Sequence, residues 1–312
     1  MNTFTFFTQS IMLELILPKR ERLIVLHIKK AVRLGLVGLV TASALVLVLA
    51  GCGKSAKSTN QKVADQKTWV VATSGTLYPT SFHASKKSAL TGYDVAVVKA
   101  VAKGLHKKVT FKEMDVDGML TAVNNGTAQM AANDFSISKQ REKQFALSTP
   151  YKFSFDSMVV RKSDHSGIHS FADLKGKKAA GEAGTSYQKL ASQLGAKQVN
   201  YDNVSNDIYL RDVANGRTDV ILNDYYLQSM ALKALPNLPL TIPKNLYFTT
   251  QNDKNGTGII MKKSNTKLTA EVDKEIKKLK ANGTITKLSK EFYGGQDVSK
   301  KPNVKTTYFK IK

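Results

Sequence analysis

The sequence is poor in the residues on which most catalytic and metal-binding sites depend. Cys52 is the only cysteine among 312 residues, which excludes an internal disulfide, a zinc site built on cysteines and a CxxC redox motif. The five histidines are not spaced as metal ligands usually are. No Ser-His-Asp or Cys-His arrangement stands at motif spacing. We therefore expect no catalytic residue, no bound metal and no cofactor, and a binding protein rather than an enzyme.

Acidic residues are also scarce, with 24 Asp and Glu against 47 Lys and Arg, so the net charge is +23. Six basic and two acidic residues precede Cys52, and the remainder of the chain therefore carries +19. This excess favours contact with anionic lipid or with acidic cell-wall and host glycans. A lysine-rich surface that only keeps the protein soluble is an equal alternative. Nucleic acid is disfavoured as a partner, because no basic-aromatic or finger motif accompanies the charge.

One long apolar run is present, residues 34–50, and it follows the basic residues Lys29, Lys30 and Arg33. This layout is typical of a secretory signal, which we place at residues 1–51. An uncleaved membrane helix is the alternative, and in both cases the chain that follows faces outward. The run ends in "LAGC", which resembles the lipobox of bacterial lipoproteins. The resemblance implies cleavage before Cys52 and acyl chains that anchor the protein to the outer face of a Gram-positive-type cell membrane.

Two flanking segments complete this region. Residues 1–22 add an apolar patch and a charged cluster ahead of the signal, so we expect translation to begin near Leu26. Residues 52–67 are rich in Lys and Ser with little to bury, and we expect a flexible tether there.

From residue 68 onward, short β-rich runs alternate with helical patterns, and the 42% hydrophobic content is enough for a core. The spacing predicts a first α/β series at residues 68–73, 92–105, 107–114, 117–126 and 128–133. It predicts a second series at residues 177–184, 186–195, 197–201, 205–216 and 218–224. Two helices follow within residues 269–295, with a break at Asn282-Gly283. Two such series in succession indicate two lobes.

Five segments resemble, in order, the amino-acid-binding proteins of ABC importers: "LTGYDVAVVKAVAKGL", "AANDFSISKQREKQFALSTPY", "FADLKGKKAAGEAGTSYQKLA", "NGRTDVILND" and "LKANGTITKLSKEFYG". The resemblance covers residues 68–296. It implies an α/β periplasmic-binding-protein type II fold, with two lobes, a hinge of two crossover strands and the ligand in the cleft. Lobe one would be residues 68–155 plus 250–312, and lobe two residues 156–249. One departure is Ala96, where the family usually has an acid.

The resemblance assigns the ligand carboxylate to Arg141, with Ser136, Thr185 and Ser186. A carboxylate entering a drying cleft needs such a planar cationic donor, because a charge cannot be buried unpaired. Taken alone, Arg141 is more simply explained by a surface ion pair with Glu142 or another neighbour. Thr185 and Ser186 stand where a helix begins and could be simple N-caps, which is compatible with anion binding at the same N–H groups.

The resemblance assigns the ligand ammonium to Asp224 and an aromatic wall to Tyr78. Asp224 follows a strand and precedes a helix, so it could be only an N-cap, and Tyr78 could be only a core residue. Asn133 and Asp134 resemble the cystine-binding branch. If the Asp134 side chain enters the cleft, it suits an extra ammonium; otherwise only its backbone contributes.

These features predict a monomeric, lipid-anchored extracellular protein that captures a polar amino acid, with L-cystine as the best guess. It would deliver the amino acid to a membrane permease of an ABC importer. The alternative is a surface adhesin that binds anionic glycans or extracellular matrix through its basic surface. A dehydratase branch shares the implied fold, but no acid–histidine pair in a motif position supports an enzyme here.

Overall fold

The computed structural model describes residues 59–312, except residues 202–203 and 253–255. The chain divides into two units at residues 57 and 58, and all described residues belong to the second unit. The predicted signal segment and Cys52 lie outside the described residues. Within the described ranges, no helix combines the length and the apolar character needed to cross a membrane.

Lobe one is built on a five-stranded sheet with the order β5-β1-β6-β14-β7. β1 pairs in parallel with β5 and β6, whereas β14 is antiparallel to β6 and β7. The strands of this sheet are β1 (Thr68–Thr73), β5 (Lys108–Glu113), β6 (Met130–Ala131), β7 (Phe145–Leu147) and β14 (Ile260–Lys262). The helices of this lobe are α3 (Thr59–Asp65), α4 (Tyr93–Gly104), α5 (Val116–Asn125), α6 (Lys139–Gln144), α10 (Thr266–Ala281) and α11 (Thr284–Phe292).

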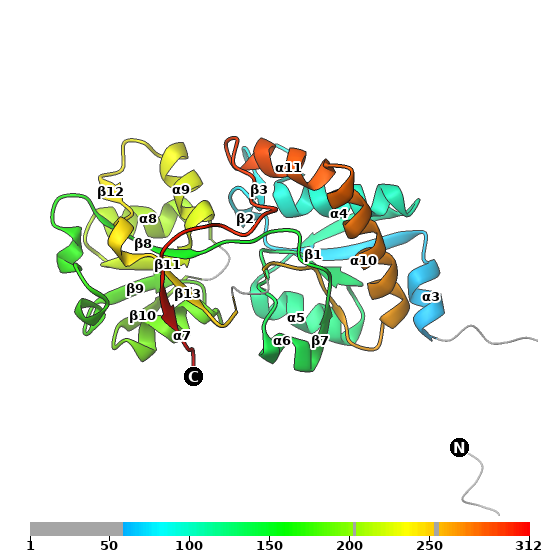
Figure 1. Cartoon of the computed structure of the whole chain (residues 1–312), viewed down its shortest axis with the longest axis horizontal. Coiled ribbons are helices and arrows are strands. Elements are labelled where there is room, and N and C mark those ends of the chain that lie inside the picture. The colour runs from blue at the N-terminus through cyan, green and yellow to red at the C-terminus, as the bar shows by residue number, and fades with distance from the viewer. Residues whose placement is uncertain (1–58, 202–203, 253–255) are drawn as a thin grey trace, which may run out of the picture. The chain divides into compact units, whose positions relative to one another are not determined.

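Lobe two is built on a seven-stranded sheet whose main path is β10-β9-β11-β8-β13-β15, with β12 paired to β8. Its strands are β8 (Asp156–Arg161), β9 (Lys178–Gly181), β10 (Lys197–Asn200), β11 (Val220–Asp224), β12 (Leu240–Thr241), β13 (Phe248–Thr250) and β15 (Thr307–Phe309). The α-helices are α7 (Ser186–Gln193), α8 (Asn206–Ala214) and α9 (Tyr225–Ala234), and short 3-10 turns lie at His165–Gly167, Phe171–Leu174 and Lys244–Leu246. Figure 1 shows the two lobes side by side, with the sheet of each covered by helices.

A small sheet of β2 (Thr76–Leu77), β3 (Ser81–His83) and β4 (Leu90–Thr91) lies between β1 and α4 in the chain. Local signals explain many boundaries elsewhere. The Asp115 side chain accepts a hydrogen bond from the Gly118 amide at 2.6 Å and begins α5, which ends at Gly126 in the left-handed conformation. Gly283, also left-handed, separates α10 from α11, as predicted.

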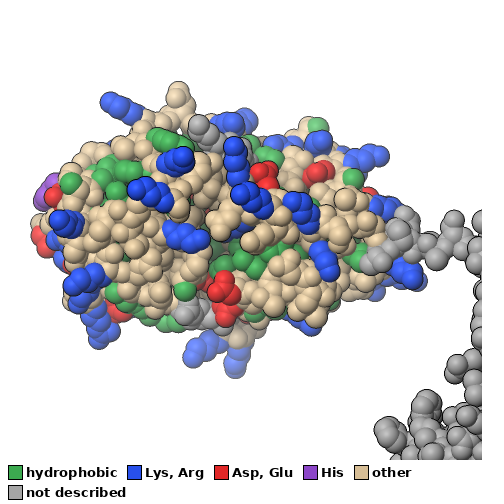
Figure 2. Space-filling model, turned by 90° about the horizontal axis from the view of Figure 1, so that it is seen from below, with side chains coloured by type: hydrophobic (Ala, Val, Ile, Leu, Met, Phe, Trp, Pro, Cys, Tyr) green, Lys and Arg blue, Asp and Glu red, His purple; other side chains and the backbone are tan. Residues whose placement is uncertain are grey.

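The apolar core forms separate clusters in the two lobes. Trp69 and Val71 of β1 pack with α4, α10 and α11 in lobe one, and Met158 and Val160 of β8 pack with α7 in lobe two. Leu227 of α9 joins the lobe-one cluster, so the lobes share apolar contact as well as chain connections. Over the surface in Figure 2, Lys and Arg side chains stand out on both lobes.

The predicted α/β fold with two lobes is confirmed, and the chain passes between the lobes at the two predicted crossovers. It also passes a third time. Val298 is buried in the core of lobe one, whereas Thr307–Phe309 form β15, which pairs in parallel with β13 in the sheet of lobe two (Figure 1). The prediction that all of residues 250–312 belong to lobe one is therefore wrong for this tail. The tail docks because Phe309 packs on Phe171 with ring centroids 4.8 Å apart.

The predicted tether at residues 52–67 is also too long. Residues 59–65 form α3, which lies against α10. The Ala64 side chain is buried there, its carbonyl accepts a hydrogen bond from Lys107 Nζ at 2.7 Å, and Asp65 pairs with Lys267 at 3.2 Å.

Candidate functional site

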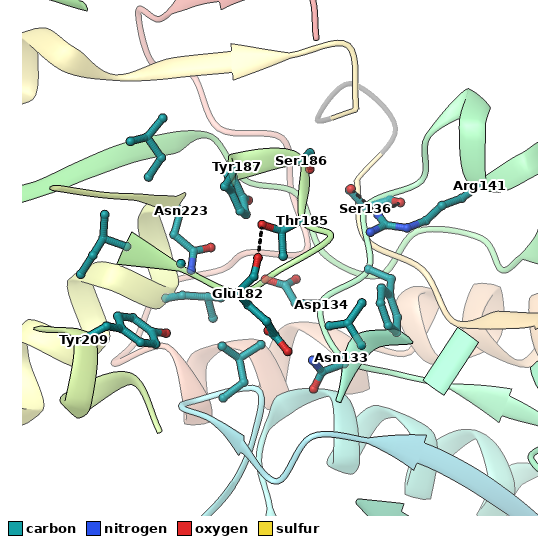
Figure 3. A pocket seen from close by; sticks show the side chains of 17 residues that line it. Asn133, Asp134, Ser136, Arg141, Glu182, Thr185, Ser186, Tyr187, Tyr209 and Asn223 are labelled. Carbon is teal, nitrogen blue, oxygen red and sulfur yellow. Dashed lines mark hydrogen bonds between the residues drawn. The ribbon is translucent and has the colours of Figure 1, made fainter. Parts of the chain in front are cut away.

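A cleft lies between the lobes, beside the carboxyl ends of parallel strands from both sheets. This is where open α/β sheets usually bind ligands. Including its opening to solvent, the cleft holds about 740 Å³ of empty space. Polar side chains from both lobes line it together with apolar ones (Figure 3); the polar ones are Asn133, Asp134, Ser136, Arg141, Glu182, Thr185, Ser186, Tyr187, Tyr209 and Asn223.

Arg141 belongs to the short helix α6, which Ser138 caps by accepting a hydrogen bond from the Arg141 amide. Its guanidinium is held in place from two sides. Nη1 donates to the carbonyl and to the hydroxyl of Ser136, at 2.9 and 2.8 Å, and the guanidinium carbon lies 5.2 Å from the ring centroid of Phe135. Burial lowers the pKa of Arg141 from its usual value, yet a guanidinium remains protonated in proteins. The structure thus brings Arg141 and Ser136 together, as predicted.

Across the cleft, Thr185 and Ser186 stand at the start of α7. The Thr185 hydroxyl accepts from the Gln188 amide at 3.3 Å and donates to the Glu182 carbonyl at 2.9 Å, so it is the N-cap of this helix. The prediction of a helix start at these residues is confirmed. The unpaired N–H groups of a first helical turn favour an anion, and here both residues line the same cleft as Arg141.

Asn133 and Asp134 follow β6 on the lobe-one side. The Asn133 amide oxygen accepts hydrogen bonds from the amide and hydroxyl of Ser74, at 3.1 and 2.8 Å. Asp134 adopts a left-handed conformation with φ of 55°, which Asp tolerates better than most residues. Its amide donates to Asp94 Oδ2 at 2.6 Å, and Thr257 Oγ1 donates to its carboxylate at 3.0 Å. Asp134 lines the cleft, but its carboxylate also has a partner within the protein.

That partner is Lys152, a functional candidate that sequence reasoning missed. Lys152 lies between β7 and β8, and its side chain has no exposure to solvent. Nζ donates to both Asp134 oxygens, at 2.8 and 2.7 Å, and to Asp224 Oδ2 at 2.5 Å. The available signal was a lysine enclosed by aromatic residues in "PYKFSF", where a solvated side chain is unexpected.

Asp224 stands at the end of β11, and its Oδ1 accepts from the Leu227 amide at 3.0 Å at the start of α9. The N-cap reading is therefore confirmed. Its side chain is only 5% exposed, and it lies beneath the lining of the cleft, bonded to Lys152, rather than in the lining itself. Asp224 thus contributes its charge to the base of the cleft through Lys152.

Asp94, Asp134, Lys152 and Asp224 together form what we call the buried ion cluster. Burial raises the pKa of Asp94 to about 7, and the neighbouring Asp134 charge acts in the same direction. Burial also raises the pKa of Asp134, although Lys152 opposes the shift. For Lys152, burial lowers the pKa, but Asp134 and Asp224 outweigh it, so the pKa stands well above its usual value. The cluster thus holds a charged lysine and an excess of carboxylates.

Comparison with known proteins identifies the family. The family model described as "Bacterial extracellular solute-binding proteins, family 3" matches residues 69–295. The chain belongs to this family. The predicted resemblance is therefore confirmed.

This solute-binding protein is 52% identical to the "Probable ABC transporter extracellular-binding protein YckB" of Bacillus subtilis, over 83% of this chain and 91% of that protein. It is 34% identical to the "L-cystine-binding protein TcyA" of Bacillus subtilis, over 74% of this chain and 82% of that protein. Among solved structures, the amino-acid substrate-binding protein AbpA of Streptococcus pneumoniae bound to L-arginine is 27% identical, with a TM-score of 0.68. The match covers 75% of this chain and 97% of that one.

In this solute-binding protein, Tyr78 lies beside the cleft lining and not in it. Leu77 lines the cleft, whereas Tyr78 lines a neighbouring hollow, with its ring 4.8 Å from Phe82 in an edge-to-face contact. The Tyr78 carbonyl accepts from Asn206 Nδ2 at 3.4 Å, which links the two lobes. Its role as a wall of the ligand site stays a prediction.

Glu182 is a second cleft residue that sequence reasoning missed. It follows β9 at the carboxyl end of the strand, and Figure 3 shows its side chain directed into the cleft. Burial raises the pKa of nearby Tyr209, and the negative charge of Glu182 adds to the shift. The signal was its position, directly after a strand in "KKAAGEAG" and three residues before the N-cap.

Proposed function

We propose that this protein captures a polar amino acid outside the cell and delivers it to an ABC importer. The observation that carries the proposal is the pairing of opposite charges in one cleft. Arg141 and the start of α7 supply a positive region, and the carboxylate of Asp134, with Asp224 beneath it, supplies a negative one. A free amino acid carries one group of each sign, and neither can be buried without a partner.

The carboxylate of the amino acid would bind Arg141, with Ser136, Thr185 and Ser186 as further donors. The ammonium would bind at the Asp134 edge of the buried ion cluster, where Asn133 is adjacent. Asp224 would act from beneath by adding negative charge. Closure of the lobes on the ligand would then present the surface that the permease recognises.

L-cystine is the first ligand that we propose. Support comes from TcyA, whose name gives L-cystine as its ligand and which is more similar in sequence than the arginine-bound AbpA. Cystine has a second ammonium, and the acidic side chain of Glu182 in the cleft suits it. A cationic amino acid such as L-arginine would use the same acid, so it is the competing ligand.

Isothermal titration of the purified protein with L-cystine, L-arginine and uncharged amino acids tests the proposal. Arg141→Ala is expected to weaken binding by about 2–5 kcal/mol, or about 30-fold to several thousand-fold, since the ligand carboxylate loses its charged partner. Arg217→Ala is the matched control, because that side chain is 75% exposed and pairs with Asp212 on the surface. Equal affinity in the two variants, both folded, would contradict the assigned site.

We further propose that the protein is held at the outer face of the membrane by lipid on Cys52, followed by a short tether. Support comes from the sequence, in which "LAGC" ends the apolar run of residues 34–50. Two or more acyl chains on a single residue are enough to retain a protein at a membrane.

A second role, ionic adhesion to acidic glycans or cell-wall polymers, rests on the +19 charge of the chain after residue 51. On the face that Figure 2 shows, the basic side chains are spread over both lobes. Such a distribution supports diffuse, salt-sensitive attraction rather than a shaped docking site.

A further inference from the structure

Lys152 is the one member of the buried ion cluster that carries a positive charge. Its side chain is 0% exposed, and its ammonium donates to Asp134 Oδ1, Asp134 Oδ2 and Asp224 Oδ2 at 2.8, 2.7 and 2.5 Å. An ammonium has three N–H donors, so all three have carboxylate partners. Nζ also lies 5.7 Å from the ring centroid of Tyr293.

These are the bonds that an amino-acid ammonium would seek. Asp134 belongs to lobe one and Asp224 to lobe two, so Lys152 joins acids from both sides of the cleft. Because Lys152 is part of the chain and fully enclosed, a ligand can displace it only at the cost of leaving a buried charge without partners. The lysine therefore occupies one ammonium position permanently.

The charges around Lys152 can be counted from the contacts. Two carboxylates meet one ammonium, which leaves one negative charge in excess. Asp94, whose pKa is about 7, is mostly protonated at pH 6, so the titrations below are made at that pH. Asp94 faces the group from α4, but it contacts Asp134 through the backbone amide and does not line the cleft. The phenols of Tyr93, Tyr151, Tyr226 and Tyr293 also lie around this group, and burial raises the pKa of each, so they stay neutral.

We propose that Lys152 is a specificity-determining residue that acts as a built-in ammonium. It neutralises one of the two carboxylates at the base of the cleft, so this end accepts a ligand with one ammonium and rejects a second one close by. This restriction to one ammonium applies only at the end of the cleft next to the buried ion cluster. A second ammonium farther along the ligand would face Glu182. The inference rests on the proposed function, since it concerns the same site.

The test compares L-homoserine with L-2,4-diaminobutyrate, which differ by a hydroxyl and an ammonium at the end of an equal side chain. In Lys152→Met the cluster holds two unneutralised carboxylates. The ratio of affinities should then shift at least about tenfold toward the diammonium ligand, given the strength of a close charge pair in a partly buried site. Affinities are measured by titration, or by competition with the tightest-binding amino acid.

A second pair of variants decides the matter if Lys152→Met does not fold. Asp134→Asn leaves Lys152 and Asp224 with no excess charge, so affinity for any α-amino acid should fall at least about tenfold. The double variant, Asp134→Asn with Lys152→Met, leaves Asp224 as the only charged member of the three. One negative charge is then restored, and most of the lost affinity should return. A purely structural ion pair would show no such recovery, since the double variant lacks the pair entirely.

The possible results separate the two levels of the argument. If the unaltered protein binds no amino acid, the proposed function fails and the inference fails with it. If it binds one, but folded Lys152→Met leaves the ratio unchanged, the inference alone is overturned. A double variant that binds as weakly as Asp134→Asn overturns it as well.

Discussion

Asp94 offers a quantitative test of the buried ion cluster. The side chain is fully buried in the first turn of α4, and its Oδ2 accepts the Asp134 amide at 2.6 Å. Burial, then the Asp134 charge, raises the pKa of this carboxyl from 3.8 to about 7. The perturbation is Asp94→Asn, whose amide oxygen can accept the same hydrogen bond without a charge.

The sign follows from proton linkage. Since the pKa of Asp94 is raised in the folded state, the folded protein holds this proton more tightly than the unfolded chain. The associated stability is therefore complete below about pH 4 and is lost as the pH rises toward 7. Each pKa unit corresponds to about 1.4 kcal/mol, so the loss between pH 5 and pH 8 is about 3 kcal/mol.

Denaturant unfolding of both proteins at pH 5 and pH 8 measures the effect. Asp94→Asn should gain stability relative to the unaltered protein, and the gain should be larger at pH 8 by about 3 kcal/mol. Other titrating groups, His83 among them, are present in both proteins and cancel. Asp207→Asn, which removes a carboxylate that is 40% exposed beside Arg211, is the control. If Asp94→Asn gained the same stability at both pH values, the reasoning would be refuted. That result would mean that the folded-state pKa of Asp94 is not raised, so its ionisation between pH 5 and pH 8 costs no stability.

Two further predictions concern the cell surface. Cys52→Ser should move the protein from the membrane fraction to the culture medium, since no thiol remains for the lipid; full retention in the membrane fraction would contradict the anchor. Binding to immobilised teichoic acid or heparin should fall steeply between 0.05 and 0.5 M salt, as expected for about 10 Å screening lengths near 0.1 M. Binding that persists at high salt would point to specific docking instead of diffuse charge attraction.

The sequence predicted those features whose cause is local. Gly126 ends α5, as predicted, and Thr185 caps α7 through a contact within three residues. The order of strands and helices followed from apolar periodicity, and the motifs around Arg141 and Ser136 identified the family. Each of these signals is contained in a short stretch of chain.

The pairing of charges could not be predicted in this way. Lys152 is 18 residues from Asp134 and 72 residues from Asp224, and only the crossing of the chain between lobes brings them together. The motifs therefore point to Asp224, and to Asp134 if its side chain enters the cleft, as partners of ligand ammonium groups, although both already have a cation within the protein. The sequence did not identify Glu182 as a cleft residue, because that position depends on which strand ends face the cleft.

The sequence by itself determined the family, the two α/β lobes, the starts or ends of several helices such as α5 and α7, and the arginine of the cleft, because each depends on periodicity or on neighbours along the chain. Only the tertiary structure decided that β15 joins the second sheet, that Tyr78 lies off the cleft, and that Lys152 neutralises part of its base. The physical reason is that strand pairing and buried ion pairs depend on the positions of distant segments. Neither the composition nor a short motif determines where those distant segments lie in the folded protein.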